Sequence, residues 1–280
     1  MLRISRILLA ALLTMLLVAP ELWQWPVPPP VPPPRPLLIF YGSLPGQASP
    51  AQLAPLEAAI KGYGLVVVHS GLESPGNPSA TVLTALIRAM PAVAFYGYLA
   101  LGVTHGEPDY SLSQIRTDLT RWQRLGVRGM LLDTAGHDYG VSTARLAAAM
   151  TAAHQLGLRL IVNAYRPQDV LAAPWAAGDF YLAENWALSE GSTPGPRAEL
   201  TLRALYRLER QGVTVAATAT EAKGWPFSHS LLEQAVLVTM DMVPGIRWLA
   251  VAGPNYSANT DAMVPALLLQ QAAAGQPRDY

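Results

Sequence analysis

The sequence contains no cysteine. This absence excludes disulfides, thiolate zinc sites, a cysteine nucleophile and an acylated lipobox cysteine. An excess of either charge is also lacking, because 19 Lys and Arg residues balance 19 Asp and Glu residues, and the basic residues are scattered along the chain. Without a basic face, no nucleic-acid partner is expected.

Several signatures of cofactor and metal sites are missing as well. Residues 41–46, which follow the first expected strand, read YGSLPG and lack the GxGxxG spacing of a nucleotide-binding turn. Ser43 and Ser70 lie outside any GxSxG elbow, and His69 and His105 lie outside any HxH or HExxH motif. We therefore expect no cofactor and no metal, and a serine hydrolase is disfavoured.

The N-terminus has the form of an export signal. Arg3 and Arg6 precede an apolar run at residues 7–19, as in a basic n-region followed by an h-region. The run is shorter than the roughly 20 residues of a dedicated membrane span, although extending it through Trp23 would make a marginal one. Residues 1–25 are therefore expected to be either a cleaved signal peptide or a retained signal anchor.

A proline-rich tract follows the leader. Residues 26–36 read PVPPPVPPPRP, which favours a polyproline II spacer and excludes a helix or a central strand. Such a tract can also bind aromatic-grooved modules, but beside an export signal a linker is the favoured interpretation. The domain at 37–280 is thus expected outside the cytoplasm, either extracellular, periplasmic or anchored to the cell surface and its membrane through the leader.

Eight short apolar runs, rich in β-branched or aromatic residues, recur along this domain. Most are nearly continuous rather than alternating, which is typical of strands in a parallel sheet covered on both faces. The runs are Leu37–Tyr41, Leu65–His69, Ala92–Leu99, Gly129–Asp133, Arg159–Asn163, Phe180–Glu184, Thr214–Ala219 and Ile246–Ala252.

The segments between these runs have helical spacing. Several end in a glycine just before the next strand, at Gly126, Gly157 and Gly212, where a helix C-cap is expected. The pattern predicts a single-domain (β/α)8 TIM barrel, which we expect to be a monomer. An open doubly wound sheet is the alternative, because the number of strands does not prove closure.

Two carboxylates end otherwise apolar strands. Asp133 follows the run at 129–132, and Glu184 follows the run at 180–183. Burying a carboxylate there is costly unless it is paired or used, and two strands apart the pair can meet at the mouth of the barrel. Glycoside hydrolysis needs such a pair, so both are candidate catalytic residues. Alternatively, each carboxylate only pairs with a cation, for example Arg128, Arg166 or Lys223.

Other polar and aromatic residues are expected at the same strand ends, where flat rings stack well on sugars. Any one of these aromatics is more often a core residue than a platform. The predicted substrate-binding set is Tyr41, His69, Tyr96, Tyr98, Asn163, Tyr165, Trp186, Glu221 and Trp225.

Two short segments are similar to a known family. Residues 97–102 read GYLALG and lead to a loop ending in Asp109 and Tyr110, which resembles the third-strand motif of endo-α-1,4-polygalactosaminidases and related spherulin-like barrels. Residues 126–133 read GVRGMLLD and resemble the family strand that ends in the catalytic aspartate. Glu184 matches the position of the second carboxylate. The chain departs from the family at 103–104, where it has Val-Thr in place of a common glutamate.

The resemblance implies an exported hydrolase of galactosamine-containing exopolysaccharide, with Asp133 as nucleophile and Glu184 as acid/base. Additional rim acids would suit a cationic polymer, although they can equally be solvated loop residues; they are Glu73, Glu107, Asp109, Asp138 and Glu221. An inactive barrel that binds polysaccharide is the alternative, and an enzyme of small metabolites is disfavoured by the leader. Stereochemistry stays open, because it depends on the distance between the carboxyls.

Overall fold

The computed structural model describes residues 34–47, 49–104, 109–188, 198–220 and 246–252. The expected signal or anchor and nearly all of the linker lie outside these ranges, so the predictions made for them stay untested. Within the described ranges, no helix is both long enough and apolar enough to cross a membrane.

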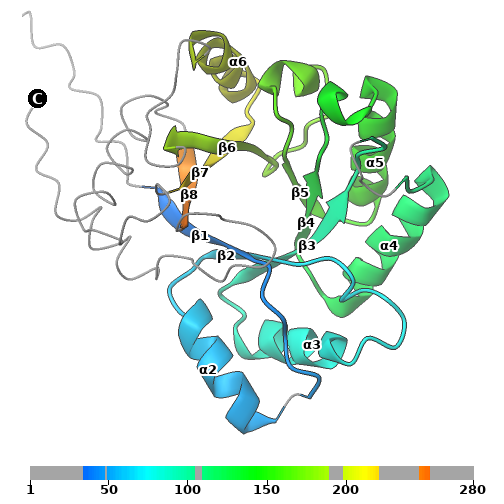
Figure 1. Ribbon diagram of the computed structural model, residues 1–280, viewed down its shortest axis with the longest axis vertical. Coiled ribbons are helices and arrows are strands. Elements are labelled where there is room, and N and C mark those ends of the chain that lie inside the picture. Colours follow the sequence, from blue (N-terminus) through cyan, green and yellow to red (C-terminus); the bar gives the residue numbers. More distant parts are fainter. Residues whose placement is uncertain (1–33, 48, 105–108, 189–197, 221–245, 253–280) are drawn as a thin grey trace, which may run out of the picture. The chain divides into compact units, whose positions relative to one another are not determined.

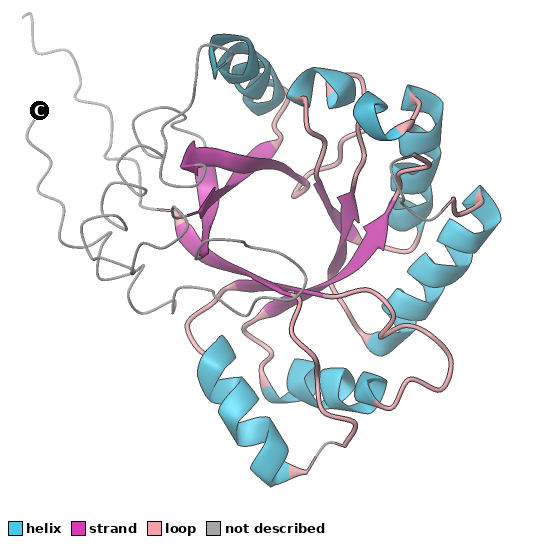
Figure 2. Cartoon of the chain, in the orientation of Figure 1, coloured by secondary structure: helices cyan, strands magenta, loops and turns pink. Residues whose placement is uncertain are grey.

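Eight parallel strands close into a barrel in sequence order (Figures 1 and 2). This confirms the predicted (β/α)8 fold and excludes the open sheet, because the last strand pairs with the first through Trp248 and Arg35. The strands are β1 (Arg35–Phe40), β2 (Leu65–Val68), β3 (Ala94–Ala100), β4 (Gly129–Asp133), β5 (Arg159–Val162), β6 (Phe180–Leu188), β7 (Thr214–Thr220) and β8 (Ile246–Ala252).

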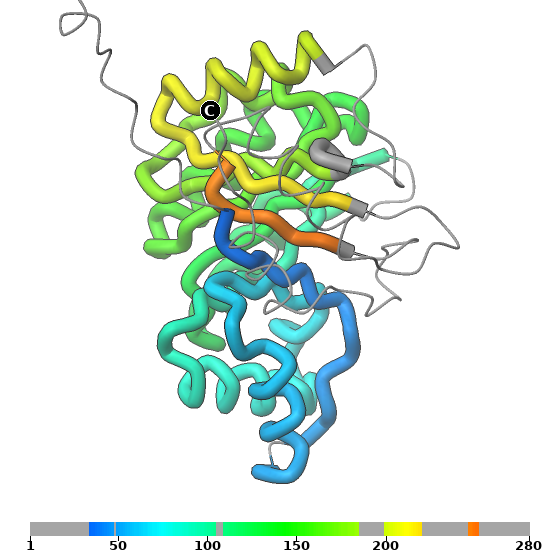
Figure 3. Tube along the Cα trace, turned by 90° about the vertical axis from the view of Figure 1, so that its left-hand side faces the viewer, coloured from blue at the N-terminus to red at the C-terminus, as the bar shows by residue number. Residues whose placement is uncertain are grey.

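The first strand begins earlier than expected. β1 starts at Arg35, so the last two residues assigned to the linker belong to the barrel. Proline has no backbone N–H to donate to a neighbouring strand, and near the start of a strand this donor is not needed. Pro36 is therefore tolerated here, and its carbonyl oxygen can still accept a hydrogen bond. Its carbonyl accepts a hydrogen bond from the Gly64 N–H at 3.3 Å. Figure 3 shows β1 running beside β8, with β7 on the other side of β8.

Helices lie outside the ring of strands (Figure 2). They are α2 (Pro50–Ile60), α3 (Ser79–Ala89), α4 (Leu112–Leu125), α5 (Thr143–Gln155) and α6 (Ala198–Arg210), with 3₁₀ turns η1 (His137–Tyr139) and η2 (Pro167–Val170). Gly126 is the left-handed C-cap of α4, as predicted. The β5–β6 connection departs from a regular βα unit: it contains η2 rather than an α-helix, because Pro167 and Pro174 interrupt a short segment.

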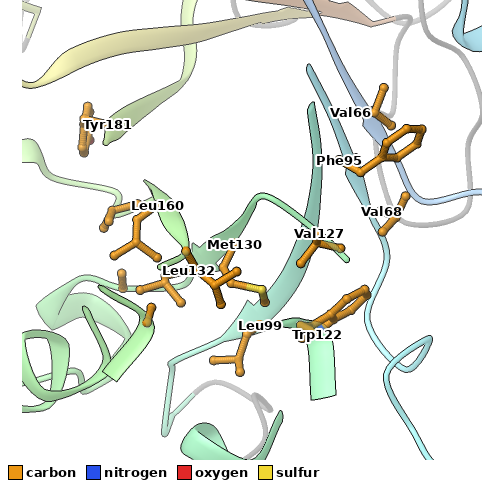
Figure 4. Close-up of a cluster of buried hydrophobic side chains, with 14 of the residues drawn as sticks. Val66, Val68, Phe95, Leu99, Trp122, Val127, Met130, Leu132, Leu160 and Tyr181 are labelled. Carbon is orange, nitrogen blue, oxygen red and sulfur yellow. The ribbon is translucent and has the colours of Figure 1, made fainter. Parts of the chain in front are cut away.

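The larger core lies between the strands and the helices. Alternate strand residues, such as Val66, Val68 and Met130, face outward in this cluster, and Trp122 of α4 packs among them (Figure 4). Gly97 on β3 makes room for that indole, because a Cβ at this position would overlap the Trp122 ring. The outward-facing residues of the strands are therefore structural and do not contribute to a site inside the barrel.

The other alternate residues fill the barrel interior. This inner core contains Leu37, Ile39, Leu65, Val67, Tyr96, Leu131, Ile161, Phe180, Leu182, Ala216, Trp248 and Ala250. Such interiors are built in layers to which alternate strands contribute. Tyr96 lies in one of these layers and is 2% exposed, and burial raises the pKa of its phenol to about 12. The prediction that Tyr96 contacts substrate is therefore corrected: it is a core residue.

The tight packing at the base of β4 yields a stability prediction. A Cβ at Gly129 would overlap both the Tyr96 ring and the main-chain oxygen of Arg159, so Gly129→Ala should destabilise the fold by about 1–3 kcal/mol. Gly46→Ala is the matched control, because its Cβ would meet Pro78 at an ordinary 3.5 Å; it should change stability by less than about 1 kcal/mol. Urea unfolding measures both, and an unchanged midpoint for Gly129→Ala would contradict the packing described here.

Candidate active site

Asp133 ends β4 with its carboxylate surrounded by hydrogen-bond donors. Its Oδ2 accepts from the Tyr98 hydroxyl at 2.6 Å, while its Oδ1 accepts from the Thr134 N–H at 2.8 Å and from Asn163 Nδ2 at 2.9 Å. Burial raises the pKa of Asp133, and these three donors oppose that rise by stabilising the anion. The carboxyl is thus half-buried yet surrounded by donors that stabilise a negative charge.

Glu184 lies on β6 and shares a donor with Asp133. Asn163 Nδ2 donates to Glu184 Oε2 at 2.9 Å, so one amide group bridges the two carboxyls. Glu184 is more exposed than Asp133, but desolvation by the surrounding protein still raises its pKa. The nearby Asp133 charge adds to this rise, and the Asn163 hydrogen bond opposes it. Of the two carboxyls, Glu184 has the weaker support for its charged form.

The shared donor also limits the spacing of the two acids. Because both oxygens lie 2.9 Å from the same nitrogen, they are no more than about 6 Å apart. Retaining glycosidases place their carboxyls about 5–5.5 Å apart, and inverting enzymes about 6.5–9.5 Å. For this pair of oxygens, the upper bound of about 6 Å lies below the range of inverting enzymes.

Cation pairing does not explain the two carboxylates in the part of the chain that the structure describes. Arg128 donates instead to the main-chain oxygen of Pro91, and Arg166 pairs with Asp138 at 3.3 Å. Lys223, the third cation considered, lies outside the described residues.

The backbone turns sharply directly after Asp133. Thr134 has φ +50°, a left-handed conformation that is unfavourable for a β-branched residue. The turn is held by the Thr134 hydroxyl, which donates to the Asp133 carbonyl at 2.8 Å and accepts from the Gly102 N–H at 2.9 Å. It directs the Thr134 N–H at the Asp133 carboxylate. Strain of this kind concentrates at functional positions, and no sequence signal had singled out Thr134.

The loops beyond β4 and β5 are joined to each other. Asp169 accepts from the His137 N–H at 2.9 Å and lies 3.2 Å from its Nδ1, and Arg166 pairs with Asp138. Asp138, predicted as a rim acid, therefore has its charge offset. These contacts join residues about 30 positions apart, and the sequence pattern gave no indication of them.

The remaining predicted substrate ligands differ in their placement. Tyr41 packs edge-on against Tyr98, with 5.8 Å between ring centroids. Tyr165 is 71% exposed at the end of β5, where a ring is free to stack. Trp186 belongs to β6, but its side chain lies outside what the structure describes. Glu221 and Trp225 are outside the described residues altogether, as is the rim acid Glu107.

A buried acid at the opposite end of the barrel has a structural role. Asp179, just before β6, accepts from the Leu160 and Ala176 N–H groups and lies 2.9 Å from His154 Nε2. Residues at this N-terminal end of a TIM barrel stabilise the fold and do not take part in chemistry. Among the described residues, no group of three His, Asp or Glu side chains could hold a metal ion.

Comparisons with known proteins identify no family. No family model matches the chain, and no curated protein matches it either. Among solved structures, 3-keto-L-gulonate-6-phosphate decarboxylase from Vibrio cholerae O1 biovar El Tor aligns with TM-score 0.47 and 10% identity, over 86% of this chain and 98% of its own. A structure assigned to the mandelate racemase/muconate lactonizing enzymes, from Sorangium cellulosum, gives TM-score 0.47 and 12% identity over 77% of this chain, which spans 52% of that structure. Likenesses this distant concern the fold alone.

The raised pKa of Glu184 predicts a pH-dependent gain in stability for Glu184→Gln. A raised folded-state pKa gives stability that is present at low pH and lost as pH rises through that pKa. Glutamine does not ionise and keeps an oxygen for Asn163, so the variant should match the wild type at about pH 4 and be more stable at about pH 7. Urea unfolding at both pH values measures this.

Glu199→Gln is the control, because Glu199 forms an exposed pair with Arg203 on α6. It should change stability by less than about 1 kcal/mol at either pH. A Glu184→Gln protein that is less stable than the wild type at neutral pH would show that Glu184 is stabilised as a charge in the folded chain.

Proposed function

We propose that the chain is an exported, retaining glycoside hydrolase acting on aminosugar-containing exopolysaccharide. The observation that carries the proposal is the Asp133–Asn163–Glu184 arrangement, in which one amide bridges two carboxyls at the mouth of the barrel. Active sites of TIM-barrel enzymes lie at this C-terminal end of the strands.

The different environments of the two acids support different roles. Asp133 accepts three hydrogen bonds, which favour the anion that a nucleophile requires. Glu184 accepts one described hydrogen bond and faces the Asp133 charge, which favours the protonated form that a general acid requires. These roles agree with those implied by the family resemblance.

The reaction then proceeds in two balanced steps. Asp133 attacks the anomeric carbon while Glu184 gives its proton to the glycosidic oxygen, so the bond to the leaving sugar breaks and a glycosyl–Asp133 ester forms. Glu184, now ionised, takes a proton from water as the water oxygen attacks the same carbon. The ester breaks, and Asp133 and the protonated Glu184 are regenerated.

The substrate class rests on less specific observations. The resemblance of residues 97–102 and 126–133 to polygalactosaminidases favours a galactosamine polymer. Tyr165 offers an exposed ring at the rim, and neither carboxyl has a cationic partner among the described residues, so a cationic sugar would meet no like charge from them. Export rests on the basic and apolar pattern of residues 1–25.

A hydrolysis assay tests the proposal. The full-length protein should release reducing ends from galactosaminogalactan or another aminosugar polymer, and Asp133→Asn and Glu184→Gln should each lower the rate by at least about 10²-fold. Circular dichroism of each variant controls for folding. Binding of polymer without release by the wild type would instead identify an inactive polysaccharide-binding barrel.

The stereochemistry and the two roles are tested by product analysis. NMR of the first product should show the anomeric configuration of the substrate, as the short carboxyl spacing requires. With an activated aryl glycoside, azide should rescue Glu184→Ala and give a glycosyl azide of retained configuration, whereas Asp133→Ala with azide should give the inverted one. An inverted product from the wild type would contradict the nucleophilic role of Asp133.

A further inference from the structure

His69 directly follows β2 and continues the row of inward-facing residues to which Val67 belongs. Val67 of β2, Leu131 of β4 and Leu182 of β6 all lie in the inner core. Each is followed, two residues further along its strand direction, by His69, Asp133 and Glu184 respectively. Residues two apart on a strand face the same side, and alternate strands contribute to one layer. The imidazole therefore faces the barrel axis on the level of the proposed reaction centre.

A main-chain contact fixes the tautomer of this histidine. His69 Nδ1 lies 2.7 Å from the Ser70 carbonyl oxygen. A carbonyl oxygen can only accept a hydrogen bond, so Nδ1 carries the proton. In the neutral ring, Nε2 is then a hydrogen-bond acceptor.

The second ring nitrogen of His69 is buried. Nε2 of His69 is shielded from solvent and has no hydrogen-bond partner among the described residues. A buried polar atom without a partner is destabilising and calls for an explanation. At the other end of the barrel, by contrast, the Nε2 of His154 pairs with Asp179.

We propose that His69 Nε2 accepts a hydrogen bond from the sugar held between Asp133 and Glu184. The donor is a hydroxyl or, on a deacetylated sugar, the ammonium group. This inference rests on the proposed function and deepens it, because it assigns one atom of the protein to one kind of group on the substrate. The imidazole holds the sugar from the β2 side, opposite β6 in the eight-stranded ring.

Binding measurements in a hydrolytically inactive background test the assignment. Calorimetry follows an α-1,4-linked galactosamine hexamer binding to Glu184→Gln alone and combined with His69→Leu or His69→Gln. Leucine removes the acceptor and should weaken binding about 10- to 100-fold, whereas glutamine offers an oxygen near the position of Nε2 and should stay within about threefold of the parent. His154→Gln, a histidine change at the opposite end, should leave the affinity unchanged.

Two further measurements identify the atom and the donor. In protein labelled with ¹⁵N-histidine, saturation with the hexamer should shift the Nε2 resonance of His69 while Nδ1 stays protonated. A fully N-acetylated hexamer that binds with the same His69→Leu penalty assigns the donor as a hydroxyl, and loss of the penalty assigns it as the ammonium.

The outcomes separate this inference from the proposed function. If the protein with His69 intact binds no aminosugar oligomer, the proposed function fails and this assignment fails with it. If that protein binds but His69→Leu binds equally well, or the Nε2 resonance does not move, the assignment to His69 is wrong and the carboxylate site stands.

Discussion

The site depends on the two N–H bonds of a single amide group. Two carboxyls whose facing oxygens lie within about 6 Å of each other repel when both are ionised, and the Asn163 amide offsets this by donating one hydrogen to each. The two N–H bonds diverge at a fixed angle, so the amide also sets the spacing between the acids. A flexible cation would offset the repulsion without fixing that spacing, and it would lower the pKa of both acids.

The apolar interior beneath the site creates the asymmetry between the acids. Below Asp133 the barrel is filled by side chains such as Leu131 and Ile161, so either charge is poorly solvated from that side. The Thr134 N–H, placed by the strained turn, and the Tyr98 hydroxyl stabilise the Asp133 anion by donating hydrogen bonds to it. The Glu184 anion accepts one described hydrogen bond and is repelled by the Asp133 charge, which raises the pKa of Glu184. Two carboxyls of similar chemistry thereby acquire different proton affinities, as acid–base catalysis requires.

Sequence patterns predicted the scaffold better than the site. The bounds of β4 and β8 were as expected, because both faces of a barrel strand are covered and the apolar run ends where the strand does. Tyr96 and Tyr98 lie on the same face of β3, and sequence alone does not say which is submerged in the core and which reaches Asp133. The left-handed backbone at Thr134 is set by contacts with Gly102, which is distant in the chain. The roles of Glu221 and Trp225 remain predictions.

The alternation of strands around the barrel also separates the hydrogen-bond donors from the acceptors at the site. Tyr98 lies on β3 and Asn163 directly follows β5, while Asp133 and Glu184 lie on β4 and β6. The groups that donate hydrogen bonds thus belong to the odd-numbered strands and the carboxylates that accept them to the even-numbered ones. The backbone of the barrel holds these donors in place, whereas mobile ions would have no fixed position. Added salt should therefore change the stabilisation of the Asp133 carboxylate little, because salt screens partly buried charges much less than exposed ones.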